Sequence, residues 1–202
     1  MSKENFELKS YDHKHRWMSY WYQIREIFTM NPAKILEVGV GNRFLYDYLK
    51  KAGKDITSVD INSERRPDVV GSVVDLPFDD NSFDAVLCFQ VLEHLPFDNF
   101  HKALIEMRRV SSRYVFLSLP HWGYTFYWIF KVPLIKQISV FLKFHGVLKN
   151  KFEFDGEHYW EIGRRGYPLR KIKAILRDSD LKILKDYINP DSPFHHFFIL
   201  EK

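Results

Sequence analysis

The chain has 202 residues, which fits one domain with a full hydrophobic core, and no run reaches the roughly 18 apolar residues that span a bilayer. A formal net charge of +4 does not by itself indicate nucleic-acid binding, because such proteins cluster Lys and Arg on one face. The single cysteine, Cys88, excludes an internal disulfide and a cysteine-based metal cluster, and its apolar neighbours predict a buried, inert thiol.

Apolar patterns with the periods of a helix and of a buried strand alternate along the chain. In chain order they predict a helix over 12–29, a strand over 34–40, a helix over 43–53, strands over 55–61, 68–74 and 83–89, a helix over 99–110, a strand over 112–120, an irregular segment over 121–155, a helix over 168–179, and strands over 181–188 and 195–202. This alternation predicts a mainly parallel sheet covered on both faces, with the last two strands as a hairpin-like pair.

The first predicted strand runs into a glycine-containing turn, in the stretch ILEVGVGNRF. Gly39 and Gly41 permit positive φ and a close approach of a ligand to the backbone, although such a turn alone is a weak signal. Phe44 stands where a dinucleotide fingerprint has its last glycine, which argues against a dinucleotide. Asp60, which ends the second predicted strand, can accept both hydroxyls of a ribose. Asp75 can accept the exocyclic amine of an adenine, so the pattern favours a single nucleoside over a nicotinamide cofactor.

The chain carries four blocks in this order: LEVGVGN, SVDI, DLPFDDNSFDAVLCFQVLEHL and YVFLSLP. Together they resemble the class I S-adenosylmethionine-dependent methyltransferases, most closely the small-molecule subgroup (methyltransferase type 11) that includes ubiquinone and menaquinone biosynthesis enzymes. The resemblance covers about residues 33–120. It implies one domain over 1–202: a three-layer, Rossmann-like α/β fold with a seven-stranded, mostly parallel sheet, a reversed last strand and a helical insertion after the fifth strand. Residues 1–30 would form an N-terminal helical cover, and residues 121–160 an insertion or lid over the acceptor site.

The resemblance also implies that S-adenosylmethionine binds as methyl donor and leaves as S-adenosylhomocysteine. Carried over residue by residue, the contacts would be Glu37, Gly39 and Gly41 at the methionine and ribose end, Asp60 at the ribose hydroxyls, Ile61 on the adenine face, Asp75 and Leu76 at the adenine edge, and Gln90 near the sulfonium. The family pattern Gly-x-Gly-x-Gly has a glycine where Arg43 stands, a position expected to open a helix with negative φ. Two interpretations of Arg43 stay open: an ion pair with the ligand's carboxylate, or a side chain that is exposed or partly exposed to solvent.

Three histidines that should lie at the ligand side of the sheet are candidate catalytic bases: His94, His121 and His158. Each also has a structural interpretation as a loop-fixing, capping or packing residue, and His195 and His196 are expected to be structural. The surroundings of His158 resemble a histidine that in many relatives precedes the helix covering the acceptor site. No metal is expected, because the histidines lack close ligand spacing and small-molecule members of the family generally need none.

The segment 121–155 is rich in aromatic and apolar residues, and a helix with a wide apolar face is predicted over 134–148. Three interpretations remain open. The segment is a lid packed on the core, a lid that also grips a large apolar acceptor, or an element that docks on a membrane or a dimer partner. Lys131, Lys149 and Lys151 suit an anionic membrane surface.

The predicted function is methyl transfer from S-adenosylmethionine to O, N or C of a small molecule, with a large, aromatic or lipid-like acceptor as one version. The main alternative is a catalytically silent member that binds the ligand or a partner, which Arg43 and the lack of an obvious acid/base pair keep open. A nicotinamide-dependent reductase is disfavoured by Phe44 and Asp75. Nucleic acid is not an expected substrate, because FQVLEHL replaces an Asn-Pro-Pro-Tyr-like motif after the fourth strand. Residues 1–10 lack a signal-peptide core, so a cytoplasmic or membrane-peripheral protein is expected.

Overall fold

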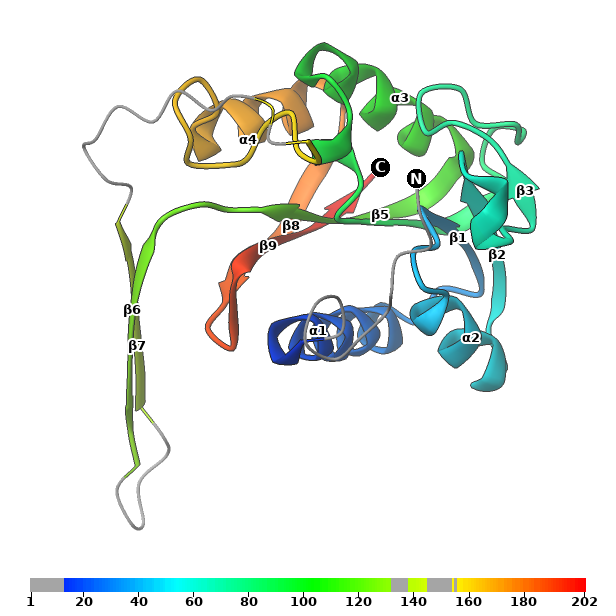
Figure 1. Ribbon diagram of the computed structural model, residues 1–202. Helices are drawn as coiled ribbons and strands as arrows, with labels where there is room; N and C mark the ends of the chain where they lie inside the picture. The colour runs from blue at the N-terminus through cyan, green and yellow to red at the C-terminus, as the bar shows by residue number, and fades with distance from the viewer. Residues whose placement is uncertain (1–12, 132–137, 145–153, 155) are drawn as a thin grey trace.

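A central sheet covered by helices, and a separate two-stranded hairpin, make up the computed structural model (Figure 1). The structure describes residues 13–131, 138–144, 154 and 156–202. Within them, no helix is long and apolar enough to cross a bilayer.

The seven strands of the central sheet are β1 (Lys34–Val38), β2 (Asp55–Asp60), β3 (Val69–Val70), β4 (Phe83–Phe89), β5 (Ser111–Pro120), β8 (Lys182–Asn189) and β9 (Ser192–Glu201). Their order is β3-β2-β1-β4-β5-β9-β8. The neighbouring pairs from β3 to β5 are parallel, whereas β9 is antiparallel to both β5 and β8. The predicted seven-stranded, mostly parallel sheet with a reversed last strand is therefore confirmed. The strand order reverses between β1 and β4, and a ligand is expected at the carboxyl ends of strands at such a switch point.

Four helices flank the sheet: α1 (Lys14–Met30), α2 (Phe44–Lys51), α3 (Phe100–Val110) and α4 (Leu169–Asp178). Helices α1 and α2 cover one face, and α3 and α4 cover the other (Figure 1). Alternate residues of a strand point to opposite faces. In β1, Leu36 and Val38 accordingly join the core beneath α3 and α4, while Ile35 joins the core beneath α1 and α2. The predicted three layers are thus confirmed.

Helix α1 is fastened to the sheet by a buried carboxylate. Glu26 accepts hydrogen bonds from Lys185 Nζ at 2.6 Å, Arg25 Nη2 at 2.6 Å and Tyr187 Oη at 3.0 Å. Burial opposes the charge on Glu26, but these bonds outweigh it and lower the pKa of the carboxyl group. The ion pairs join α1 to β8 and so fix the cover over this face of the sheet.

The insertion after β5 contains an antiparallel hairpin of β6 (Tyr124–Phe130) and β7 (Ile138–Phe144). The helix predicted over 134–148 is wrong at 138–144, and the rest of that prediction lies outside the described residues. The described part of the insertion is thus a hairpin rather than a helix. Aromatic and β-branched residues dominate both strands, and these favour a pleated strand over a helix.

Candidate functional site

The loop between β1 and α2 lies at the switch point of the sheet and has a left-handed backbone. Gly39 has φ of +80° and Gly41 has φ of +53°. A Cβ atom on Gly39 would lie 2.3 Å from Val91 Cγ2, so the loop passes too close to the segment after β4 for any side chain. The Val40 N–H donates to Asp60 Oδ2 at 3.0 Å, which ties the loop to the end of β2.

Arg43 also has a left-handed backbone, with φ of +66°. The expected negative φ is therefore wrong, and the conformation costs a residue other than glycine about 1–2 kcal/mol. The side chain is 22% exposed. Its guanidinium donates to the Arg66 carbonyl, lies 3.5 Å from Asp47 Oδ1 and sits over the Tyr46 ring at 4.4 Å. The side chain is thus partly exposed, as the second interpretation expects, and the protein's own groups engage its guanidinium.

Glu37, at the carboxyl end of β1, carries a buried and incompletely partnered carboxylate. Its Oε2 atom has no hydrogen-bond partner among the described residues. Burial raises the pKa of Glu37 well above the usual value, although the positive charge of Arg43 acts in the opposite direction. A buried carboxylate of this kind calls for a cation or a hydrogen-bond donor, and a bound ligand can supply either.

The other predicted cofactor contacts follow β2, β3 and β4. Asp60 uses Oδ2 for Val40 and Oδ1 for the Asn62 N–H at 2.9 Å, and Ile61 beside it is 75% exposed. Asp75 is exposed, on a turn that its own N–H closes by donating to the Ser72 carbonyl. Gln90 has φ of +55° and donates from Nε2 to Ser118 Oγ at 3.2 Å. The fold thus brings these residues to the carboxyl ends of the parallel strands, where the glycine turn also lies.

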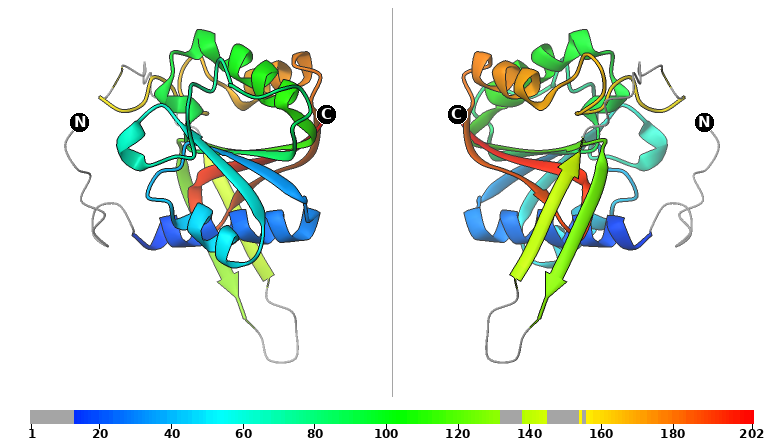
Figure 2. Two further views of the ribbon diagram at one scale, coloured as in Figure 1. Left: turned by 90° about the vertical axis from the view of Figure 1, so that its right-hand side faces the viewer. Right: turned by 90° about the vertical axis from the view of Figure 1, so that its left-hand side faces the viewer.

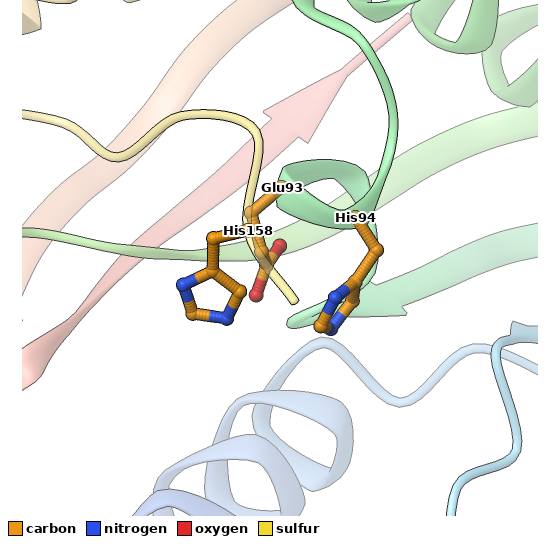
Figure 3. Close-up of side chains that lie close together, drawn as sticks. All are labelled: Glu93, His94 and His158. Carbon is orange, nitrogen blue, oxygen red and sulfur yellow. The ribbon is translucent and has the colours of Figure 1, made fainter. Parts of the chain in front are cut away.

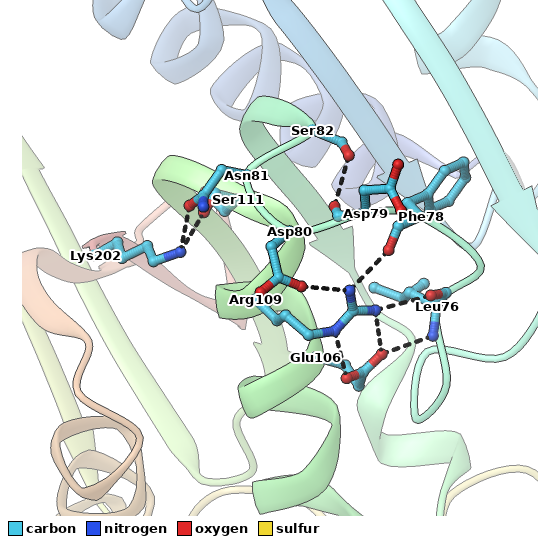
Figure 4. Close-up of polar contacts among 10 residues, drawn as sticks. All are labelled: Leu76, Phe78, Asp79, Asp80, Asn81, Ser82, Glu106, Arg109, Ser111 and Lys202. Carbon is cyan, nitrogen blue, oxygen red and sulfur yellow. Dashed lines mark hydrogen bonds and ion pairs between the residues drawn. The ribbon is translucent and has the colours of Figure 1, made fainter.

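Leu76 differs from Asp75, the residue before it, because it is a core residue. Its N–H donates to Glu106 Oε2 at 2.9 Å, and its carbonyl accepts from Arg109 Nη2 at 2.9 Å (Figure 4). Arg109 also donates to the Phe78 carbonyl at 2.7 Å. Helix α3 is therefore hydrogen-bonded through its side chains to the backbone of the loop after Asp75. Of the two predicted adenine contacts, Asp75 is accessible, whereas Leu76 is buried with its backbone already bonded.

We expect Arg109→Ala to lower the free energy of unfolding by about 2 kcal/mol. Several charge-assisted hydrogen bonds are lost, and the Arg109 side chain that makes them is only partly exposed. The neighbouring Arg108 makes one long bond, 3.2 Å to the Asp180 carbonyl, so Arg108→Ala is the matched control with a loss under about 1 kcal/mol. Urea unfolding measures both. Equal losses would show that Arg109 does not hold the loop.

Two of the three predicted catalytic histidines meet around a carboxylate that the sequence did not single out. His94 ends a short 3₁₀ helix (Leu92–His94) after β4, and His158 approaches from the segment that follows the insertion (Figure 3). Glu93 lies beside both rings, which contact each other edge to face with their centroids 5.0 Å apart. One possible ligand atom from each of the three residues lies within 4.8 Å of those of the other two. We call these three residues the Glu93 cluster. The adjacency of Glu93 and His94 is visible in the sequence, but the burial of Glu93 is not.

The surroundings of the Glu93 cluster are specific. His94 Nδ1 lies 2.9 Å from the Glu157 carbonyl oxygen, and His158 Nδ1 lies 3.1 Å from Glu161 Oε1. Burial raises the pKa of Glu93 to about 8 and lowers the pKa of His94. Burial also opposes the charge on Glu161, but hydrogen bonds from His158 and Arg164 outweigh it and lower the pKa of that group.

His121, the third predicted catalytic residue, lies elsewhere. It is buried, and its Nδ1 atom lies 2.8 Å from Nδ1 of His196, which is bonded in turn to Asp186. Asp186 also pairs with Lys173 of α4. This polar chain links the end of β5 to β8, β9 and α4, so the structure favours the structural interpretation for His121 and is consistent with the same expectation for His196.

An aromatic groove of about 920 Å³ lies between α1, the start of α2 and the turn between β8 and β9. Trp17, Trp21, Phe44 and Tyr48 are among its lining residues. None of the predicted cofactor contacts lines it, so the groove is distinct from the glycine turn.

Residues 36–116 match the sequence profile of a family described as a methyltransferase domain. The match covers less than half of the chain, so it shows a similarity of this stretch to methyltransferase domains. The matched stretch includes the glycine turn, Asp60, Asp75 and Glu93 with His94, whereas His158 lies outside it.

Solved structures share the fold of this chain. A Burkholderia thailandensis 1,6-didemethyltoxoflavin-N1-methyltransferase, solved with its acceptor and S-adenosylhomocysteine, is 14% identical, with a TM-score of 0.58 over 94% of this chain and 86% of that one. A Synechocystis magnesium protoporphyrin IX methyltransferase with bound S-adenosylmethionine is 11% identical, with a TM-score of 0.63 over 93% and 80%. An uncharacterised protein of Methanocaldococcus jannaschii is 35% identical over 81 residues, which is 38% of this chain and 35% of that relative. The matched stretch thus spans about a third of the curated relative.

Proposed function

We propose that the protein transfers a methyl group from S-adenosylmethionine to a small-molecule acceptor. The observation that carries this proposal is the buried Glu37 carboxylate with its unpartnered Oε2 atom, beside the left-handed glycine turn at the switch point of the sheet. The family match over residues 36–116 supports it, as do two structural neighbours with S-adenosylmethionine or S-adenosylhomocysteine bound.

The residues at the sheet edge fit such a ligand. Glu37 would pair with its ammonium group, and Gly39 leaves the space that a side chain would fill. Asp60 would accept the ribose hydroxyls through its remaining lone pairs, Ile61 would cover one face of the adenine, and Asp75 would accept the exocyclic amine. When bound, the donor supplies a methyl group on a sulfonium, which an acceptor nucleophile displaces with release of S-adenosylhomocysteine.

The chain's own contribution to methyl transfer is then to align the two reactants and exclude water. His94 and His158 lie at the ligand edge of the sheet, so the proposal places the acceptor beside them. Two neighbours are named for ring-bearing acceptors, 1,6-didemethyltoxoflavin and magnesium protoporphyrin IX, and this supports a ring-bearing or apolar acceptor. We also place the protein in the cytoplasm, since its one cysteine is a buried free thiol compatible with a reducing compartment.

Calorimetric titration tests the proposal. We expect S-adenosylmethionine and S-adenosylhomocysteine to bind and NADH not to bind, and tight binding of NADH alone would overturn the assignment. Binding of both adenosyl ligands without methyl transfer to any ring-bearing acceptor would favour the catalytically silent alternative.

Asp60→Ala is expected to weaken S-adenosylmethionine binding by about 1–3 kcal/mol, because the ribose loses its acceptor and the Val40 N–H loses its tie to β2. Asp55→Ala is the matched control, since Asp55 is an exposed acid at the opposite end of the same strand. Calorimetry on the two variants measures the difference. An unchanged affinity in Asp60→Ala would remove Asp60 from the ribose site.

A further inference from the structure

The Glu93 cluster contains a buried carboxylate that lacks a hydrogen-bond donor in the described part of the chain. Glu93 is fully buried, and neither of its carboxylate oxygens has a hydrogen-bond partner among the described residues. Figure 3 shows this carboxylate close to the rings of His94 and His158. An isolated buried carboxylate is costly unless a cation or hydrogen-bond donor compensates it, so the site calls for a positive charge.

The two imidazoles are oriented as metal ligands are. A carbonyl oxygen can only accept, so His94 Nδ1 carries the proton that it shares with Glu157, and a metal would bind through Nε2. His158 directs Nδ1 at the Glu161 carboxylate, which Arg164 Nε holds at 2.9 Å, so a metal would again bind through Nε2. Metal-bound histidines usually donate their other ring nitrogen to a carbonyl or carboxylate in this way.

We propose that Glu93, His94 and His158 bind a divalent transition-metal ion. Two imidazoles and one carboxylate match the preference of Zn²⁺, Fe²⁺ or Mn²⁺, whereas Mg²⁺ and Ca²⁺ prefer sites made of oxygen ligands. One possible ligand atom from each residue lies within 4.8 Å of those of the other two, so the site must close for all three to form bonds of about 2.0–2.2 Å to one ion.

Three protein ligands leave coordination positions open for a further group. An acceptor oxygen or nitrogen bound there would lose its proton more easily, because the metal stabilises the deprotonated form. This role rests on the proposed methyl transfer, whereas the metal site itself does not. The wide separation of His94 and His158 in the sequence had argued against a metal, and the fold removes that objection.

Titration of metal-stripped protein with Co²⁺ alone tests the site, because Co²⁺ bound to imidazole and carboxylate absorbs visible light. We expect one Co²⁺ per chain, displaced by Zn²⁺, with the dissociation constant raised at least tenfold in Glu93→Gln and in His158→Ala. His101→Ala, at an exposed histidine of α3, is the matched control and should bind Co²⁺ normally.

Absence of a visible Co²⁺ band, or a band that both Glu93→Gln and His158→Ala retain, would overturn the metal site. Circular dichroism identifies a variant that fails to fold, and the other variant then decides. Because this titration contains no methyl donor, its outcome is independent of the calorimetry with S-adenosylmethionine. Failure of one proposal is therefore distinguishable from failure of the other.

A second inference concerns the β6–β7 hairpin and rests on different observations. One face of the hairpin presents seven exposed apolar side chains: Tyr124, Phe126, Trp128, Phe130, Val140, Leu142 and Phe144. These side chains pair across the two strands, with Phe126 opposite Leu142 and Trp128 opposite Val140. We call this surface the hairpin face. Apolar patches of this kind mark interaction sites.

The hairpin face is directed away from the central sheet. Lys143, on the opposite face of the hairpin, donates to the carbonyls of His121 and Pro193, so that opposite face is the one turned toward the sheet. The hairpin itself extends beyond the body of the domain, past α1 (Figures 1 and 2). The structure therefore does not support a lid whose apolar face packs on the core.

We infer that the hairpin face binds the surface of an anionic lipid bilayer. Residues 121–152 contain five lysines and no Asp or Glu, so this stretch of sequence carries a net positive charge. An exposed aromatic face within a lysine-rich segment suits the interface of an anionic membrane. A second copy of the chain fits less well, because two such cationic segments would repel each other.

Sedimentation with vesicles tests this inference. We expect binding to vesicles of phosphatidylcholine with 30% phosphatidylserine, little binding to phosphatidylcholine alone, and weaker binding at high salt. The double change Phe126→Ser and Trp128→Ser should lower the apparent affinity at least tenfold. Trp21→Ser, at an equally exposed tryptophan on α1, is the matched control and should leave it unchanged.

Failure to sediment with the anionic vesicles, or equal sedimentation of both variants, would overturn the membrane inference. Sedimentation velocity provides a further check. A concentration-dependent dimer that is lost only in the double variant would assign the hairpin face to a second copy instead of a membrane.

Discussion

Replacement of Gly39 by alanine is expected to destabilise the protein by about 3 kcal/mol and to abolish measurable binding of S-adenosylmethionine. About 1–2 kcal/mol comes from the left-handed backbone at φ of +80°. Another 1–3 kcal/mol comes from the new Cβ atom, which would lie 2.3 Å from Val91 Cγ2. The loop must move away from β4 to relieve this contact, which breaks the bond from Val40 to Asp60 and displaces the glycine turn. Urea unfolding and calorimetry measure the two effects.

Gly53 offers a matched control for this prediction. It has nearly the same φ, +79°, but a Cβ atom there meets nothing within 4 Å. Gly53→Ala should therefore show the backbone cost alone, about 1–2 kcal/mol, with normal ligand binding. The double change Gly39→Ala and Val91→Ala removes the clashing methyl group and should recover part of the stability lost in the single change. Equal effects of the two single glycine changes would disprove the steric argument.

Trp160→Ala is expected to lower the free energy of unfolding by about 3–5 kcal/mol. Trp160 is fully buried, donates from Nε1 to the Leu95 carbonyl at 3.2 Å, and has its ring centroid 5.0 Å from those of Phe97 and Phe100. These contacts pack the segment that carries His158 and Trp160 against the segment that follows His94. Loss of the indole should therefore also disrupt the Glu93 cluster and, if the metal proposal holds, weaken Co²⁺ binding.

Two further changes separate packing from polarity at this position. Trp160→Phe should keep most of the ring contacts and lose one hydrogen bond, so a cost of about 1–2 kcal/mol is expected. Tyr159→Ala removes the neighbouring aromatic residue, which is partly exposed, and should cost under about 1 kcal/mol. Thermal unfolding ranks the three variants. A loss in Trp160→Ala no larger than that in Tyr159→Ala would show that the segment is held by other contacts.

The sheet and its flanking helices were predictable because their apolar patterns are long and separated by clear turns. Asp60 and Asp75 were placed at the ligand side by the same logic, since Asp60 ends β2 and Asp75 follows the apolar stretch 68–74 in the sequence. Their contacts with a ligand stay predictions. Leu76 shows the limit of this reasoning, because the bond from its N–H to Glu106 depends on how α3 packs and is not visible in the local sequence.

The insertion and Arg43 were mispredicted for local reasons. Apolar residues in 138–144 satisfy both a helical and an alternating spacing, and the pairing with β6 that decides between them is not a property of that stretch alone. Arg43 occupies a left-handed position that a glycine would suit better, so its φ could not be inferred from its residue type. The contact between His94 and His158 likewise required the three-dimensional path of the chain.

The position of β9 has a consequence for how the protein acquires its structure. This strand lies between β5 and β8, so until β9 enters, β5 lacks a hydrogen-bonding partner on one side and β8 has no partner in the central sheet. The β5–β9 pairing joins residues about 80 positions apart, which makes closure of the sheet a late and slow step. Meanwhile β5, apolar along most of its length, offers an open edge to other chains. The yield of refolding should therefore fall with protein concentration, even though the finished sheet hides that edge.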